Sequence, residues 1–326
     1  MIHIHSWTIT ALIRVNVVSA SARLFCLDTV MIDIVLRIAT IPESGSDVLA
    51  NEHLIATGGG YNAMSAAARQ GVGAVYAGRL GRGPFSSIAR SALENDHVEE
   101  PIAADDSHDA GFCVALIDDG GERTFITSAG AEASLRFADL SSLDVHGGDY
   151  VLVSGYNVMY PGAAEIVLEW LASLGDDVRV AFDPAIRVMD IPDKNLRPVL
   201  GRADWTLCNE TEASSLTGAD DLEASVRALG ELTGRVGVVV RHGATGCTVL
   251  VNGGEPVLVD GFNVAVVDTN GAGDTHSGVF LAELALGTDV IEAARRGNAA
   301  SAVAISVLGP ASCPDRDVVT DMLRRV

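Results

Sequence analysis

The feature that most constrains how this 326-residue chain can fold is an alternation of short β-branched runs with Ala-rich runs. The β-branched runs predict strands at residues 23–27, 74–77, 150–153, 178–182, 205–208 and 236–241. Most of them are apolar at successive positions, which is typical of strands buried on both faces. The Ala-rich runs predict helices at residues 63–70, 88–94, 163–174, 222–232, 278–286 and 290–307. This order predicts an α/β fold in which helices cover both faces of a mostly parallel sheet.

Two further segments alternate polar and apolar residues and predict strands outside the parallel sheet. They are residues 47–57 and 111–128, the second with an Asp-Asp-Gly-Gly turn at 118–121. We expect them to form a small antiparallel lid on the main domain. A similar segment at 247–267, with an Asn-Gly-Gly turn at 252–254, is expected to extend the edge of the main sheet.

The chain is expected to form one domain, residues 23–326, after an N-terminal extension. The extension, residues 1–22, is expected to be poorly ordered. Arg14 and Asn16 interrupt its apolar run, which argues against a secretory signal and against a membrane span.

The net charge restricts the partners that the protein can have. The chain has 22 Lys and Arg against 43 Asp and Glu, a formal charge of −21. This charge repels phosphate backbones and anionic lipids, so neither nucleic-acid nor membrane partners are expected. The five cysteines are scattered and include no Cys-x-x-Cys pair, which predicts free thiols in a reducing compartment, the cytoplasm.

The segment Asp-Thr-Asn-Gly-Ala-Gly-Asp-Thr at residues 268–275 is the strongest indication of chemistry. Its Gly271-Ala272-Gly273 turn leads into a predicted helix, whose first N–H groups can hold an anion. Asp274 follows the turn directly, so it can accept a proton from a hydroxyl while the N–H groups hold the charge of a transferred phosphoryl group. The alternative is that Asp274 only caps the helix.

The same segment resembles the C-terminal signature of the ribokinase-like (PfkB) family of carbohydrate and nucleoside kinases. Four other segments resemble motifs of this family, in the same order along residues 22–326. These segments are Gly58-Gly59-Gly60-Tyr61-Asn62, Asp183-Pro184-Ala185-Ile186-Arg187, Asn209-Glu210-Thr211-Glu212 and Arg241-His242-Gly243-Ala244-Thr245-Gly246. The resemblance implies a ribokinase-like three-layer α/β/α domain. It also implies an ATP-dependent kinase that phosphorylates a hydroxyl of a sugar or sugar-like small molecule.

The resemblance implies a role for each matching residue. Asp274 would be the catalytic base, and the backbone N–H groups of Gly271, Ala272 and Gly273 would form the anion hole. The substrate-binding residues would be Asp33, Gly58, Gly59, Gly60 and Asn62. The residues near the nucleotide would be Asn209, Arg241, Gly243, Gly246 and Asn298.

Two ions are also implied. Asn209 and Glu212 would orient Mg²⁺, largely through water, and the compatible alternative is a helix N-cap with its capping-box partner. Some relatives bind a monovalent cation such as K⁺. Its ligands here would be Asp268, Asn270, Ala304, Gly309 and Cys313.

For three polar residues an ordinary structural role is the alternative. Asp33 is expected just beyond the first buried strand, either at the substrate or as a solvated turn residue. Asn298 would lie near the adenine or on a helix surface. His276 is expected on a helix surface rather than at the nucleotide.

Three departures from the family pattern lie on the sugar side. Asp28 replaces a glycine, Met31 replaces the common asparagine, and Glu132 stands where asparagine is more common. The phosphoryl-transfer motifs are intact, so we expect phosphoryl transfer, whereas the sequence does not identify the acceptor.

Two other functions remain as alternatives. One is a nucleoside kinase of the same fold, and the other is a catalytically silent sensor of sugar or nucleotide. A Rossmann dehydrogenase is not expected, because no Gly-x-Gly-x-x-Gly follows the first strand. A homodimer that pairs through the lid is compatible with the exposed edges of such a sheet.

Overall fold

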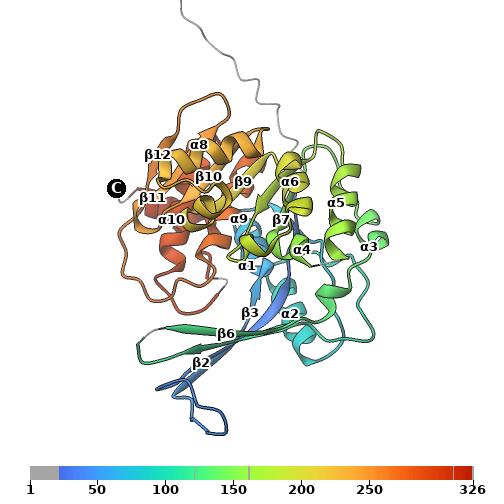
Figure 1. Cartoon of the computed structure of the whole chain (residues 1–326), viewed down its shortest axis with the longest axis vertical. Helices are drawn as coiled ribbons and strands as arrows, with labels where there is room; N and C mark the ends of the chain where they lie inside the picture. Colours follow the sequence, from blue (N-terminus) through green and yellow to red (C-terminus); the bar gives the residue numbers. More distant parts are fainter. Residues whose placement is uncertain (1–21, 121, 161, 311, 325–326) are drawn as a thin grey trace, which may run out of the picture.

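The computed structural model describes residues 22–120, 122–160, 162–310 and 312–324 (Figure 1). The expected N-terminal extension, residues 1–22, lies outside these ranges except for Ala22.

The larger of two sheets contains every strand that the β-branched runs predict. Its strands are β1 (Arg23–Leu27), β4 (Gly73–Tyr76), β7 (Tyr150–Ser154), β8 (Arg179–Asp183), β9 (Trp205–Asn209), β10 (Gly237–Arg241), β11 (Gly246–Val251) and β12 (Val257–Asp260). Across the sheet they lie in the order β12-β11-β10-β9-β8-β7-β1-β4. The pairs from β4 to β10 are parallel, whereas β11 and β12 pair antiparallel at the edge. The predicted parallel sheet with an antiparallel extension is confirmed.

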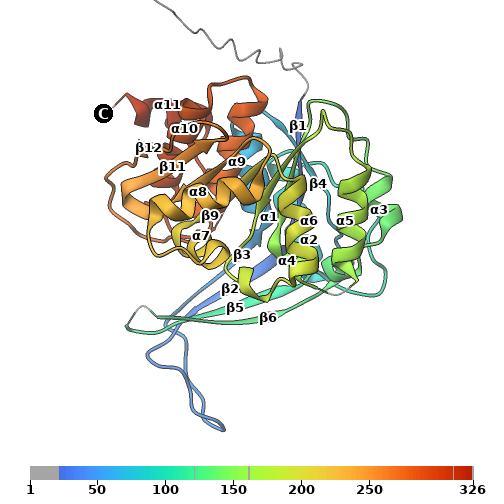
Figure 2. The ribbon, with the colours of Figure 1, turned by 45° about the horizontal axis from the view of Figure 1, so that its top comes forward.

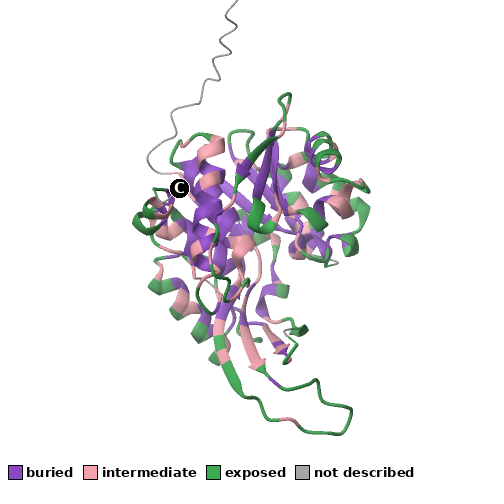
Figure 3. Cartoon of the chain, turned by 90° about the vertical axis from the view of Figure 1, so that its left-hand side faces the viewer, coloured by how far each residue is buried: buried purple, intermediate pink, exposed green. Residues whose placement is uncertain are grey.

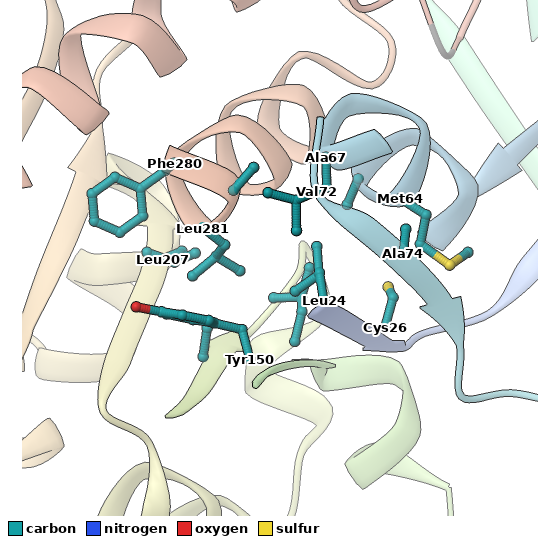
Figure 4. Packing of buried hydrophobic residues seen from close by; sticks show 14 of the residues in the cluster. Leu24, Cys26, Met64, Ala67, Val72, Ala74, Tyr150, Leu207, Phe280 and Leu281 are labelled. Carbon is teal, nitrogen blue, oxygen red and sulfur yellow. The ribbon is translucent and has the colours of Figure 1, made fainter. Parts of the chain in front are cut away.

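Helices cover both faces of this sheet. Successive side chains of strand β1 point to opposite faces and therefore enter two separate cores. Leu24 and Cys26 lie in the core that α9 closes, shown in Figure 4. Phe25 and Leu27 lie in the core that α5 closes. The first face carries α1 (Gly60–Arg69), α9 (Ala272–Ala285), α10 (Val290–Ala304) and α11 (Arg316–Leu323). The other face carries α3 (Phe137–Ser141), α4 (Gly155–Met159), α5 (Ala163–Ser173), α6 (Asp193–Arg202), α7 (Glu210–Thr217) and α8 (Leu222–Thr233).

The smaller sheet forms the lid and projects from the body of the molecule (Figure 1). Its strands are β2 (Val30–Arg37), β3 (Glu52–Gly59), β5 (Phe112–Ile117) and β6 (Arg123–Ser128), in the order β3-β2-β5-β6. Pairs β2–β3 and β5–β6 are antiparallel, but β2–β5 is parallel, so the lid is mixed rather than purely antiparallel. The chain returns to the body between β2 and β5, and a long crossover of this kind permits parallel pairing.

Strand β2 was not predicted from the sequence. It follows β1 after two residues, and its nearly continuous apolar run gives no sign of a new element. Helix α2 (Pro84–Asn95) packs against β2 and β3 at the root of the lid. The outer part of the lid is exposed, as Figure 3 shows.

Several other elements differ from the expected ones. Helix α9 begins earlier than predicted, because its polar, Gly-rich first turn lacks the apolar periodicity of a helix. Helices α3, α4, α6 and α11 and the short 3₁₀ turns were not predicted, and α7 was anticipated only through the alternative of an N-cap at Asn209. These turns are η1 (Ala131–Ser134), η2 (Val188–Asp190) and η3 (Gly243–Thr245). In the described ranges, no helix combines the length and the apolar character that a membrane span requires.

Candidate active site

A cavity of about 630 Å³ is lined by residues of the lid and of the carboxyl ends of the central strands. Figure 2 shows the lid strands β2, β3, β5 and β6 below the body of the molecule. Asp28 directly follows β1, Ser154 ends β7 and Asp183 ends β8, and all three line the cavity. Ligands of open α/β sheets bind at this edge. The wall is completed by Asp33, Cys113, Phe125 and Thr127 of the lid, Asn62 of α1, and Asn270, Asp274 and Ser277 of the segment around α9.

Asp274 lies in the first turn of α9 and reaches the cavity. The side-chain amide of Asn62 donates a hydrogen bond of 2.9 Å to its Oδ2 atom. Burial raises the pKa of Asp274 to about 6, and the nearby Asp183 and Asp33 act in the same direction, against Asn62 and Arg241. The carboxylate is therefore ionised at neutral pH yet basic enough to accept a proton.

The turn before Asp274 has the geometry of a helix N-terminus. Gly271 has φ +73°, a left-handed conformation that favours glycine. The N–H of Thr275 donates to the Gly271 carbonyl at 2.9 Å and so begins the helical ladder. The N–H groups of Gly273 and Asp274 precede that bond, and α-helices do not pair such groups internally.

Arg241 lies directly behind this turn. Its guanidinium donates to the Gly273 carbonyl at 2.8 Å, to Ser277 Oγ at 2.7 Å and to Asp183 Oδ2 at 3.1 Å. The side chain is only 14% exposed, so its contacts are mainly with the protein. Arg241 thus joins the end of β10 to the first turn of α9 and to the end of β8.

Asn209 and Glu212 form a complete capping box at the start of α7. Asn209 Oδ1 accepts from the Glu212 N–H at 2.9 Å, and Glu212 Oε2 accepts from the Asn209 N–H at 2.8 Å. Burial and the nearby Asp183 raise the pKa of Glu212 to about 7. The helix-cap alternative therefore describes the geometry, and a carboxylate at the end of β9 is also compatible with a hydrated Mg²⁺.

Asp33 follows the first buried strand as expected, but it lies inside strand β2 of the lid and lines the cavity, so the alternative of a solvated turn residue was wrong. Its Oδ2 atom accepts from the side-chain amide of Asn270 at 3.3 Å, and burial raises its pKa. A side chain on Gly58 would clash with the Asp33 carboxylate, and one on Gly59 would clash with the Thr29 carbonyl. These glycines therefore let β3 approach the acidic groups closely.

Asp28 and Glu132, two of the departures from the family pattern, also line the cavity. Asp28 Oδ1 accepts from the Thr29 N–H at 2.6 Å, and burial together with Asp274 raises its pKa to about 7. Glu132 accepts from the N–H groups of Gly111 at 3.0 Å and Gly130 at 2.6 Å. The sequence marked both positions as unusual but assigned neither of them a role.

The residues expected near the adenine lie away from this cavity. Gly243 and Gly246 have φ +65° and +103° in the turn that joins β10 to β11. Asn298 is buried in α10, and its amide donates to the carbonyls of Val259 and Asp260 at 2.9 and 3.2 Å. It is therefore not on the helix surface.

His276 is also buried, so its expected place on a helix surface was wrong. Its side chain is 2% exposed, and neither ring nitrogen has a hydrogen-bond partner among the described residues. Burial, together with the nearby Arg241, lowers the pKa of His276 to about 3. This could not be predicted from the sequence, because α9 is buried on all sides only when it packs between α1 and α10.

Three of the residues expected to hold a monovalent cation already accept hydrogen bonds from the protein. Asp268 accepts from Arg123 at 2.9 Å and from the N–H groups of Asn270 and Gly309 at 3.0 and 3.2 Å. The Ala304 carbonyl accepts from Ser312 at 3.0 Å, and the Cys313 carbonyl accepts from Arg69 at 2.7 Å. These bonds involve three of the five expected residues and leave a second lone pair on each carbonyl oxygen, so K⁺ binding here stays a prediction.

Comparison with known proteins agrees with this geometry. Residues 21–317 match the pfkB family of carbohydrate kinases. The chain is 30% identical over 291 residues to an uncharacterised sugar kinase, YegV, of Escherichia coli K12, covering 88% of this chain and 89% of the relative. It is 28% identical over 295 residues to an ATP-dependent ribose-1-phosphate kinase of Halopiger xanaduensis, covering 89% of this chain and 94% of the relative.

Several solved structures have the same fold. One of them is an Escherichia coli protein assigned as ribokinase II, in complex with ATP and Mg²⁺, with a TM-score of 0.80 and 22% identity. The match covers 94% of this chain and all of that one, 100%. The family match extends over most of the chain, and the three-layer fold agrees with it. The chain therefore belongs to the pfkB family of carbohydrate kinases.

Proposed function

We propose that the protein transfers the γ-phosphoryl group of ATP to a hydroxyl of a sugar or sugar-like small molecule, with Asp274 as the general base. The observation that carries this proposal is the position of Asp274. It lies between a cavity lined by hydrogen-bond acceptors and the N-terminal turn of α9. An acceptor hydroxyl in the cavity and a phosphoryl group at the turn would meet at its carboxylate.

The reaction uses the two sides of Asp274 differently. The acceptor oxygen attacks the γ-phosphorus, its proton passes to the Asp274 carboxylate, and ADP leaves with the electrons of the broken P–O bond. The N–H groups of the Gly271–Gly273 turn stabilise the negative charge on the transferred group. Asn62 fixes the orientation of Asp274 through its 2.9 Å hydrogen bond.

ATP and Mg²⁺ are the proposed cosubstrate and metal, in line with the ligands of the Escherichia coli structure of the same fold. Asn209 and Glu212 would hold Mg²⁺ through water, and the metal would neutralise charge on the phosphates. The proposed nucleotide-binding residues are Asn209, Arg241, Gly243, Gly246 and Asn298. The K⁺ site stays a prediction, and no step of the proposed reaction depends on it.

The lid has two proposed roles. Closure over the acceptor would exclude water, which otherwise competes as a nucleophile. The exposed side chains of Ile55 and Ile126 on the lid, together with its edge strand β6, are the proposed surface of a homodimer. Sedimentation equilibrium of the wild type and of Ile126→Asp tests the dimer, since a monomeric wild type contradicts it.

The test of the function is ADP release from Mg-ATP with sugars, polyols and nucleosides, adenosine included, as acceptors. We expect acceptor-dependent release that is lost in Asp274→Asn. Release only with nucleosides identifies a nucleoside kinase. Ligand-induced thermal stabilisation without any release identifies a sensor and overturns the proposal.

A further inference from the structure

Besides Glu132, whose carboxylate accepts from two backbone N–H groups, three carboxylates in the cavity receive hydrogen bonds from uncharged groups only. Asp28 accepts from a backbone N–H at 2.6 Å, and Asp33 accepts from the amide of Asn270 at 3.3 Å. Asp274 accepts from the amide of Asn62 at 2.9 Å. The three come from different elements but line one cavity. Their negative charges therefore add up in a partly dehydrated space, which is costly without a cation.

The cations near this wall are already paired. Arg241 bonds to Asp183 at 3.1 Å, and Arg187 bonds to Asp190 at 2.7 Å. The incoming triphosphate adds further negative charge at the edge of the cavity. The charge that remains for the acceptor to compensate is therefore negative.

A second feature of the wall also calls for a donor. Asn62 is 2% exposed and lines the cavity. Its amide nitrogen is committed to Asp274, and its Oδ1 atom has no partner among the described residues. A buried carbonyl oxygen of this kind needs a hydrogen-bond donor, and none of the three carboxylates can supply one when ionised.

Asp28 is the member of this group that the family pattern does not include. It fits because Gly60 has no side chain: a Cβ atom there would lie 2.8 Å from the Cβ of Asp28. Burial and the neighbouring Asp274 raise the pKa of Asp28 to about 7. A bound cation would favour its ionised form.

Building on the proposed kinase function, we propose that the acceptor carries a protonated amine besides the hydroxyl that is phosphorylated, and that Asp28 binds this amine. Amino sugars and amino polyols form this chemical class. An ammonium group has three donors and no acceptor, so it matches a wall of carboxylate and amide oxygens. Its charge also offsets the charge that Asp28 adds to that of Asp33 and Asp274.

Matched acceptors test this proposal. Glucosamine, glucose and N-acetylglucosamine form one set, and galactosamine, galactose and N-acetylgalactosamine form another. ADP release gives kcat/KM for each, and calorimetry gives its Kd. We expect the free amine to be preferred over the hydroxyl by about tenfold or more, as for a hydrogen bond to a charged group.

Two variants distinguish the effect of the Asp28 carboxylate from the effect of the overall charge of the protein. Asp28→Asn keeps the shape of the side chain and should lower the preference for the amine by about tenfold. Asp220→Asn removes one negative charge from the exposed surface and should leave that preference unchanged. If the wild type prefers the neutral sugars, or if Asp28→Asn keeps the preference, this inference is overturned.

The two proposals fail in different ways. ADP release with neutral sugars alone, lost in Asp274→Asn, overturns the amine and leaves the kinase function intact. Absence of release with every sugar in both sets and with the polyols and nucleosides of the wider panel, while ATP binds, overturns the kinase function and this inference together.

Discussion

The two sides of the cavity hold their carboxylates in opposite ways. On the phosphoryl-transfer side, Asp183 is paired with Arg241, whose guanidinium also binds the Gly273 carbonyl. On the acceptor side, Asp28 and Asp33 receive only backbone and amide donors. One side is cross-linked and charge-balanced, whereas the other is open and negative.

The proposed function gives a physical reason for this difference. Charge that develops in phosphoryl transfer is best met by groups that are already fixed, since reorganisation during the reaction costs rate. An acceptor site instead needs hydrogen-bonding capacity that the protein leaves unused. The transfer side is accordingly built on the central sheet, and half of the acceptor side is built on the projecting lid (Figure 3).

Asp274→Asn should have the largest effect on turnover. Loss of the general base should lower kcat by about 10³-fold, with the affinities for ATP and acceptor nearly unchanged. For the wild type, kcat/KM should fall as the pH drops below about 6, where Asp274 becomes protonated, and should level off above it. Steady-state kinetics and calorimetry measure both, and more than a tenth of the activity in the variant contradicts the assignment.

Arg241→Met should remove the charge balance on the phosphoryl-transfer side of the cavity. It leaves the Asp183 carboxylate without its cation in a largely buried site, so we expect a loss of about 3–5 kcal/mol in the free energy of unfolding. The control is Arg227→Met, which removes exposed bridges to Glu223 and Glu255 and should leave the urea midpoint nearly unchanged. Equal urea midpoints for the two variants would show that the Arg241–Asp183 ion pair does not stabilise the fold.

Asp33→Asn should affect the acceptor side alone. We expect KM for the acceptor to rise about tenfold or more, because a charge-assisted hydrogen bond becomes a neutral one, while kcat changes little. KM for ATP serves as the internal control. A similar rise in both KM values would mean that Asp33 acts on the whole site rather than on the acceptor.

His276→Phe should have a smaller effect, which is on the stability of the fold at acidic pH. The lowered pKa of about 3 means that the folded protein holds His276 neutral, whereas the unfolded chain protonates it near its ordinary value. The unfolded state therefore binds more protons between these values, and wild-type stability is lost as the pH falls below about 6.5. Phenylalanine keeps an aromatic ring stacked on Phe280 and should reduce this loss.

Thermal denaturation at pH 5 and pH 7.5 measures the effect. His53→Phe, at an exposed position on the lid, is the matched control and should leave the pH dependence unchanged. If His276→Phe is destabilised as strongly as the wild type at pH 5, the acid sensitivity has another origin.

Replacing K⁺ by Na⁺ should have the smallest effect. The Asp268 carboxylate already accepts from Arg123 and from two backbone N–H groups, so we expect kcat to change less than about twofold. Activation by K⁺ that saturates would show that the ion displaces these donors.

Much of this site could be predicted because of one property of parallel sheets. Motifs that follow separate strands meet at a common edge, so Asp183, Asn209 and Arg241 fall close together without any knowledge of side chains. The position of Asp33 could not be predicted from the order of the parallel strands. Its strand β2 pairs with β5 far along the chain, and no local pattern signals that pairing.

The sequence by itself determined the alternation of elements, the layered α/β architecture and the Gly-rich turn that ends in Asp274. These depend on local periodicity and on the conformational freedom of glycine, which are properties of short segments. Only the tertiary structure decided which charges are paired. Asn62 and Asp274 are 212 residues apart, and Arg241 and Asp183 are 58 residues apart. Their contacts therefore form only when the chain has folded. For the same reason, only the folded chain shows that Asp28 and Asp33 have uncharged hydrogen-bond donors and no cationic partner among the described residues.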